Sequence, residues 1–247
     1  TSDRAEAFRR LRWPVSRAVS YLPVFSTIGE PAEPAVLREH PARPVIGVLS
    51  HSSEGARADL LFQALKCLRR PGRDDDHAIP CIVLLGAPGP SSAGGRYWRD
   101  LARRSGMDRH LEFTGVVAEG VLGSNLEACD LLVLLDPNGP TSRKTTLAAG
   151  LAYGMPIVAL DGSDRWADLV EREAVVVVPG EPGPLALTLG GLLDSADRRR
   201  YLGCHARSFY RQHMRLELIA SGMARVIEET MQGRLSTDTA VRGERRP

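Results

Sequence analysis

Short apolar runs alternate with segments of helical spacing along most of the chain. The apolar runs cover residues 45–49, 81–85, 111–114, 131–135, 157–159 and 174–178. Each run is nearly continuous, which is typical of strands that are buried on both faces of a parallel sheet. The helical segments between them supply the crossover connections. The pattern therefore predicts an α/β fold with a doubly wound, Rossmann-like parallel sheet of six strands and C-terminal helices.

The chain divides into three parts. We expect an initial region at residues 1–43, a Rossmann-like domain at 44–232 and a polar, disordered tail at 233–247. The initial region contains a charged helical segment, a strand-like segment and a proline-rich linker, at residues 2–11, 17–25 and 26–43. The domain's helices are predicted at residues 56–68, 96–105, 119–128, 141–153, 164–170, 182–193, 196–209 and 216–231.

One loop gathers hydrogen-bond donors at the start of a helix. It follows the strand at 131–135, and its donors are Thr141, Ser142, Arg143, Lys144 and Thr145. The first amides of a helix have no partner within the helix, and the helix dipole places partial positive charge there. Hydroxyl, guanidinium and ammonium groups beside those amides predict a binding site for a phosphate or diphosphate.

A second interpretation of this loop stays open. Ser142 and the threonines can cap the helix while Arg143 and Lys144 are solvated. Cations at a helix start oppose the dipole, however, and the sequence shows no acid immediately beside these two. We favour the anion site for that reason.

Two better-known nucleotide motifs do not fit. The residue before Lys144 is Arg143, not the glycine of a P-loop, and the preceding glycine stands one position too close. No G-x-G-x-x-G follows the first strand, so a dinucleotide oxidoreductase is only weakly supported. His51 follows that strand, where we favour a loop role over a catalytic one. Asp136 is expected to shape a turn, with a metal or ribose contact as the alternative.

The composition argues against a nucleic-acid partner and for a protein of a reducing compartment. The 247 residues have a net charge of +2 and no dense basic stripe, so we expect no nucleic-acid partner. Lys66 and Lys144 are the only lysines among 32 basic residues, a bias that we attribute to a GC-rich, bacterial genome. Four scattered cysteines are expected to be reduced and buried, in a cytoplasmic protein without a bound metal. The chain starts at Thr1, and we expect it to be a fragment or a processed product.

Three segments together resemble the C-terminal, donor-binding domain of retaining GT-B glycosyltransferases of family 4 (group 1). They are Phe113-Thr-Gly115-Val-Val, Leu126-Glu-Ala-Cys-Asp130-Leu-Leu-Val-Leu135 and Leu147-Ala-Ala-Gly-Leu-Ala-Tyr-Gly154-Met-Pro156-Ile-Val-Ala159. The resemblance covers about residues 44–231. It implies that residues 1–43 end an N-terminal, acceptor-binding domain, most of which this chain lacks.

The resemblance also implies site roles. The donor diphosphate would be bound by Arg57, Ser142, Arg143, Lys144 and Thr145. The nucleoside and sugar would lie against Ser50, His51, Gly115, Val116 and Thr141. The donor is expected to be a nucleotide sugar such as a UDP-sugar, with no cofactor and no metal required. No catalytic residue is assigned, because the acceptor and any group acting on it belong to the missing domain.

The chain departs from the family where two glutamates are expected. Those positions are Thr141 and Ala149, and the loop is similar to a divergent branch that carries Ser-Arg-Arg-Gly-Ser/Thr. An inactive binding or partner domain is therefore the alternative function, and a nucleotide-sugar epimerase of the same architecture is a weaker one. Contact of residues 4–14 with a membrane surface is less favoured than a solvated helix.

Overall fold

The computed structural model describes residues 21–31, 43–49, 56–68, 79–86 and 89–243. Its centre is a parallel sheet of six strands in the order β3-β2-β1-β4-β5-β6. In chain order the strands are β1 (Val45–Val48), β2 (Cys81–Leu84), β3 (Leu111–Phe113), β4 (Leu131–Leu134), β5 (Ile157–Leu160) and β6 (Val176–Val178). The predicted fold class and all six predicted strands are confirmed, with ends that differ by one or two residues.

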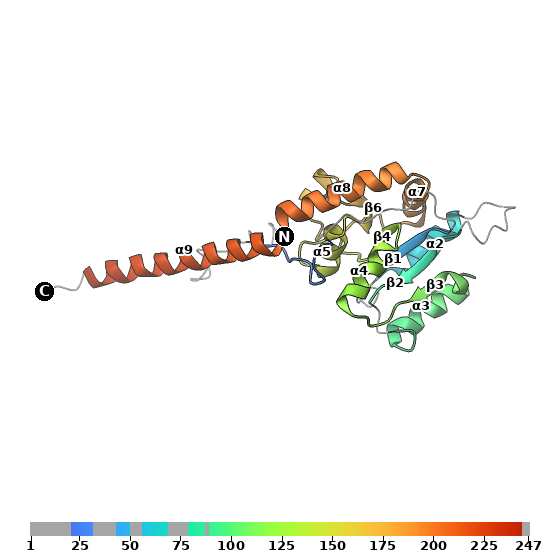
Figure 1. Cartoon of the computed structure of the whole chain (residues 1–247), viewed down its shortest axis with the longest axis horizontal. Coiled ribbons are helices and arrows are strands. Elements are labelled where there is room, and N and C mark those ends of the chain that lie inside the picture. The colour runs from blue at the N-terminus through green and yellow to red at the C-terminus, as the bar shows by residue number, and fades with distance from the viewer. Residues whose placement is uncertain (1–20, 32–42, 50–55, 69–78, 87–88, 244–247) are drawn as a thin grey trace.

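Helices cover both faces of this sheet (Figure 1). They are α2 (Ala58–Leu68), α3 (Ala93–Arg104), α4 (Glu119–Glu127), α5 (Thr145–Ala152), α6 (Ala167–Glu171), α7 (Pro182–Leu193), α8 (Ala196–His213) and α9 (Leu216–Gly243), with a short 3-10 helix η3 (Asp108–His110) before β3. Leu131 and Val133 of β4 pack into the core on the side of α2, α3 and α7. Leu132 and Leu134 point the other way, toward α5 and α8. Period-two alternation of fully apolar residues thus gives β4 two buried faces.

Helix α5 lies unusually close to the sheet because its inner side is built from small residues. A Cβ added at Gly150 would lie 2.8 Å from a methyl group of Leu132 and 3.0 Å from one of Ile157. Ala148, Leu151 and Ala152 are fully buried beside it. Close packing fixes the position of the helix and therefore the position of its first turn.

Helix α9 leaves the domain as a single long helix (Figure 1). It continues to Gly243, beyond the helix end predicted at residue 231, while the disorder of residues 233–247 stays a prediction. Residues 232–243 contain no proline, and nothing in them breaks the helical hydrogen bonding.

The strand expected at 17–25 is wrong over its described residues, because residues 21–25 are irregular. Tyr21 packs against the buried cluster beside α5 and α8, and Leu22 lies close to Gly222 of α9. The predicted helix at 2–11 and the segment 4–14 considered for membrane contact lie outside the described residues. In the described part of the chain, no helix is long and apolar enough to cross a membrane.

The sheet has one point where the strand order reverses. Strands β2 and β3 follow β1 outward on one side, and β4, β5 and β6 extend on the other. Ligands of open α/β sheets bind at the carboxyl ends of the two strands that flank such a point. Here those strands are β1 and β4, and the residues that follow them are Arg57 and the loop that begins at Asp136.

Candidate functional site: the loop between β4 and α5

The loop begins with a turn that Asp136 shapes. The Asp136 carboxylate accepts a hydrogen bond from the Asn138 amide at 2.8 Å, and its carbonyl accepts one from the Gly139 amide at 3.1 Å. Gly139 has a φ of 87°, a left-handed conformation that favours glycine. The expected turn-shaping role of Asp136 is present.

The loop after β5 holds this turn in place. The Asp164 amide donates to the Asn138 carbonyl at 2.8 Å, and the Trp166 amide donates to the Pro140 carbonyl at 2.9 Å. Gly162 lies so close that an added Cβ would stand 2.1 Å from the Asn138 carbonyl carbon. Backbone hydrogen bonds and close packing therefore hold the loop after β4 and the loop after β5 together.

Helix α5 begins at Thr145, four residues later than predicted. Thr141 and Ser142 belong to a turn instead, which the Lys144 amide closes by donating to the Thr141 carbonyl at 3.2 Å. The N-cap residue is Lys144, and its side chain makes no capping hydrogen bond. An ammonium group has no lone pair with which to accept one. The hydroxyl cap of the alternative interpretation is therefore absent, and Thr145, the first residue of the helix, is exposed.

Both cations of the loop are paired with acids. The Lys144 ammonium contacts the Asp136 carboxylate, and Arg143 Nη2 lies 2.7 Å from Asp164 Oδ2. The inference that these cations lack a nearby acid is therefore wrong. The pairs could not be predicted from the sequence, because Asp136 and Asp164 are eight and twenty-one residues from their partners along the chain. The conformation of the loops brings each aspartate into contact with its cation. Burial lowers the pKa of Lys144, whose side chain is 20% exposed, while the Asp136 carboxylate acts against that change.

Arg57 lies at the same edge of the sheet. Its amide donates to the Leu135 carbonyl at 3.0 Å, which places its backbone directly beside the first residues of the loop. Its guanidinium pairs with Asp59 at 3.0 Å, and this hydrogen bond lowers the pKa of the Asp59 carboxyl. The structure thus places the Arg57 backbone beside the start of the loop that carries Arg143 and Lys144, and each of these cations is paired with an aspartate.

Thr141 and Ser142 are buried rather than open. They are 4% and 0% exposed, and among the described residues the Thr141 hydroxyl oxygen has no hydrogen-bond partner. Tyr21 covers this part of the loop, and burial raises the pKa of its phenol while the nearby Ser142 hydroxyl opposes the change. The Val24 amide donates to the Ser142 carbonyl at 2.9 Å. Sequence analysis missed these contacts because Tyr21 and Val24 precede the loop by more than a hundred residues.

The remaining predicted residues lie farther away or cannot be placed. Gly115 follows β3, two strands from β1, and has a φ of 69°. Val116 beside it is 84% exposed. The neighbouring Thr114 hydroxyl accepts a hydrogen bond from the Gly86 amide at 2.9 Å, which joins the ends of β2 and β3. Ser50 and His51 lie outside the described residues.

The cysteines and acids form no further centre in the described part of the chain. Cys81 and Cys129 are buried, whereas Cys67 and Cys204 are exposed, so the expectation of four buried thiols is half wrong. None of the four forms a disulfide among the described residues, and burial raises the pKa of Cys81 to about 11. Among the residues that the structure describes, no three His, Cys, Asp or Glu side chains are grouped as a metal site.

Several solved glycosyltransferase structures have the same fold as this chain. Sucrose-phosphate synthase from Thermosynechococcus elongatus superposes on 94% of this chain with a TM-score of 0.70 and 20% identity. The C-terminal domain of LpcC, a group 1 family glycosyl transferase from Francisella tularensis, covers 70% with a TM-score of 0.53 and 16% identity. The fold is that of a GT-B C-terminal domain. HepE from Anabaena, solved with UDP and glucose, has this fold as well, with a TM-score of 0.61, 19% identity and 76% coverage of this chain.

The GT-B fold is larger than this chain. The chain spans 58% of the sucrose-phosphate synthase chain and 49% of the HepE chain, against 87% of the isolated LpcC domain. No family model matches the sequence. No curated protein matches it either. The likeness therefore establishes the fold alone.

Proposed function

We propose that this chain binds the diphosphate of a nucleotide sugar and forms the donor-binding half of a glycosyltransferase. The observation that carries the proposal is the position of three cations. Arg57 follows β1, Arg143 and Lys144 follow β4, and these are the two strands at which the sheet order reverses. We expect a ligand in that crevice to meet all three positive side chains and the start of α5.

The start of α5 is suited to an anion because its N-cap leaves the first turn uncapped. Lys144 contributes positive charge where a serine or aspartate would contribute an acceptor. The helix dipole adds partial positive charge along the same direction. A phosphate oxygen at this position would accept hydrogen bonds from the first-turn amides and from the Thr145 hydroxyl together.

Such a site would promote departure of the nucleoside diphosphate. Cleavage of the bond between sugar and phosphate leaves additional negative charge on the diphosphate. Arg143, Lys144 and Arg57 would stabilise that charge as it develops, which lowers the barrier to transfer. The aspartate partners balance the charge of these cations before the donor arrives.

The same arrangement supports the other parts of the donor. Gly115 and Val116 follow β3, and we expect their backbone groups to contact the base. UDP is our first choice of nucleotide because HepE, which shares the fold, was solved with UDP and with UDP-glucose. The acceptor would be bound by a domain outside this chain, in keeping with its coverage of about half of the full-length neighbours.

One observation favours a second function, a binding domain without catalysis. Thr141 and Ala149 stand where the family resemblance implies two glutamates, and both are at least 95% buried. No carboxylate of this pair is available to the sugar or the ribose. A domain that kept the diphosphate site and lost sugar recognition would bind a nucleoside diphosphate and transfer nothing.

Calorimetric titration tests the donor site. We expect UDP, or one of GDP, ADP and TDP, to bind with a dissociation constant below 1 mM, and inorganic pyrophosphate to compete with it. Uridine without phosphates is the matched control and should bind far more weakly. If none of the four nucleoside diphosphates binds below 1 mM, the proposed donor site is wrong. Hydrolysis or transfer from a bound UDP-sugar would separate the enzyme from the binding domain.

A further inference from the structure

A segment that precedes the sheet lies against the proposed site. We call residues 21–31 the strap. The Val24 amide of the strap donates to the Ser142 carbonyl at 2.9 Å. Ser142 is fully buried and directly precedes Arg143 and Lys144. The strap therefore supplies a hydrogen-bond partner to the backbone of the loop at the residue before its two cations.

Aromatic packing adds a second contact between strap and loop. The Tyr21 ring packs edge-to-face on Trp166, with ring centroids 6.2 Å apart. Trp166 in turn packs edge-to-face on Phe209 of α8 at 4.9 Å, and its amide donates to the Pro140 carbonyl. Trp166 thus touches the strap, the loop and α8, and a shift in any one of these is resisted by the other two.

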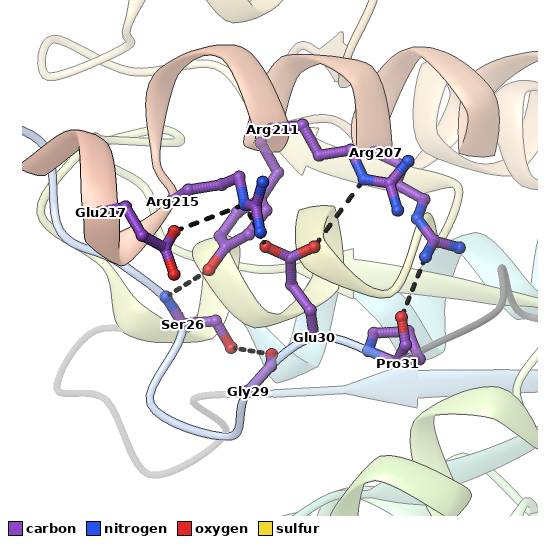
Figure 2. Close-up of polar contacts among 9 residues, drawn as sticks. Ser26, Gly29, Glu30, Pro31, Arg207, Arg211, Arg215 and Glu217 are labelled. Atoms are coloured by element: carbon purple, nitrogen blue, oxygen red, sulfur yellow. Dashed lines mark hydrogen bonds and ion pairs between the residues drawn. The ribbon is translucent and has the colours of Figure 1, made fainter.

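The other end of the strap is attached to α8 and to the start of α9 (Figure 2). The Glu30 carboxylate accepts a hydrogen bond from Arg215 Nε at 3.0 Å and lies 3.8 Å from Arg211 Nε. Arg207 Nη2 donates to the Pro31 carbonyl at 2.9 Å. With 22% exposure, the Glu30 side chain is partly shielded from solvent, so its ion pairs are screened less than surface pairs.

A short turn joins these two ends. The Ser26 hydroxyl donates to the Gly29 carbonyl at 2.9 Å, and Gly29 has a φ of 73° (Figure 2). The Ser26 amide donates to the Tyr210 hydroxyl of α8 at 3.3 Å. Only five residues separate the Val24 contact from the Glu30 contact. A turn fixed by its own hydrogen bonds transmits a displacement at Glu30 to Val24.

We propose that Glu30 is a positioning residue of the diphosphate site. It would touch no ligand. By pairing with Arg211 and Arg215 it holds the strap, the strap holds Ser142, and Ser142 sets the direction of Arg143 and Lys144. This inference rests on the proposed function for the identity of the ligand, but the coupling between Glu30 and the loop is a property of the protein alone.

The test compares Glu30→Ala and Glu30→Asp with the unmodified chain. We expect Glu30→Ala to weaken UDP binding about fivefold in calorimetry, and Glu30→Asp to restore part of the loss because it keeps the negative charge. Asp197→Ala is the matched control, since it removes an exposed pair with Arg200 on α8, away from the strap. It should leave UDP affinity unchanged.

Hydrogen exchange without ligand separates this inference from the proposed function. In Glu30→Ala we expect faster exchange in the peptide covering residues 139–147, with no change in β2 or α7. Unchanged exchange at 139–147 would overturn the coupling whether or not UDP binds. UDP binding by Glu30→Ala as tight as in the unmodified chain would overturn the positioning role. Absence of UDP binding by the unmodified chain, with faster exchange in the variant, would instead refute the proposed ligand.

Discussion

Arg143 and Asp164 meet across 2.7 Å and thereby join the loop after β4 to the loop after β5. Arg143 is 46% exposed in this pair, and Asp164 is 20% exposed. A guanidinium with that exposure can exchange one carboxylate partner for an incoming phosphate. In this pair the positive charge of Arg143 is balanced by the Asp164 carboxylate before a ligand binds.

Removal of the Asp164 charge is expected to strengthen diphosphate binding. Asp164→Asn keeps the backbone hydrogen bond to Asn138 but removes the anion that competes for Arg143. An exposed ion pair contributes up to about 1 kcal/mol, so the gain should reach at most about fivefold in affinity for UDP or pyrophosphate. Calorimetry measures it directly. Weaker binding in this variant would show that Asp164 orients Arg143 rather than competes for it.

Replacement of Asp136 is expected to make binding sensitive to pH. Asp136→Asn keeps an acceptor for the Asn138 amide but leaves the half-buried Lys144 without its anion. Burial then acts alone and lowers the Lys144 pKa further. Above that pKa the ammonium loses its proton and its attraction for a diphosphate. UDP affinity should therefore fall with rising pH at a lower pH in the variant than in the unmodified chain, and coincident pH profiles would refute this role of Asp136.

The contact between the two loops predicts a cost for any side chain at Gly162. In Gly162→Ala the new methyl group would meet the Asn138 and Gly139 backbone, which cannot yield as a flexible side chain would. We expect a loss of about 1–3 kcal/mol in the free energy of unfolding, with weaker UDP binding. Gly180→Ala is the matched control, because an added Cβ there meets nothing within 4 Å. Equal melting temperatures for the two variants would contradict the described packing.

The sequence was sufficient to predict the sheet because its signal is local. Continuous apolar runs such as 131–135, set between helical segments, identify a buried parallel strand without knowledge of its neighbours. The same local signal located the loop at the end of β4. It misplaced the start of α5, since Thr141 and Ser142 have the composition of a helix cap but lie in a turn that Tyr21 and the loop after β5 cover.

The pairing of charges was not predictable in the same way. Lys144 with Asp136 and Arg143 with Asp164 are contacts between segments whose approach depends on Gly139 and Gly162. No spacing rule for a helix or strand describes them. The contact of the strap with Ser142 was not predicted for a similar reason. It is made by the backbone amide of Val24, and any residue other than proline can donate such a hydrogen bond.

The central claim is that a diphosphate binds at the start of α5, and one titration tests it most directly. UDP affinity is measured for the unmodified chain and for a variant that carries Arg143→Gln and Lys144→Gln. A charged hydrogen bond contributes about 1.5–3 kcal/mol, so loss of both cations should weaken UDP at least tenfold while uridine binding stays the same. The same UDP affinity in both proteins would contradict the account and place the diphosphate elsewhere.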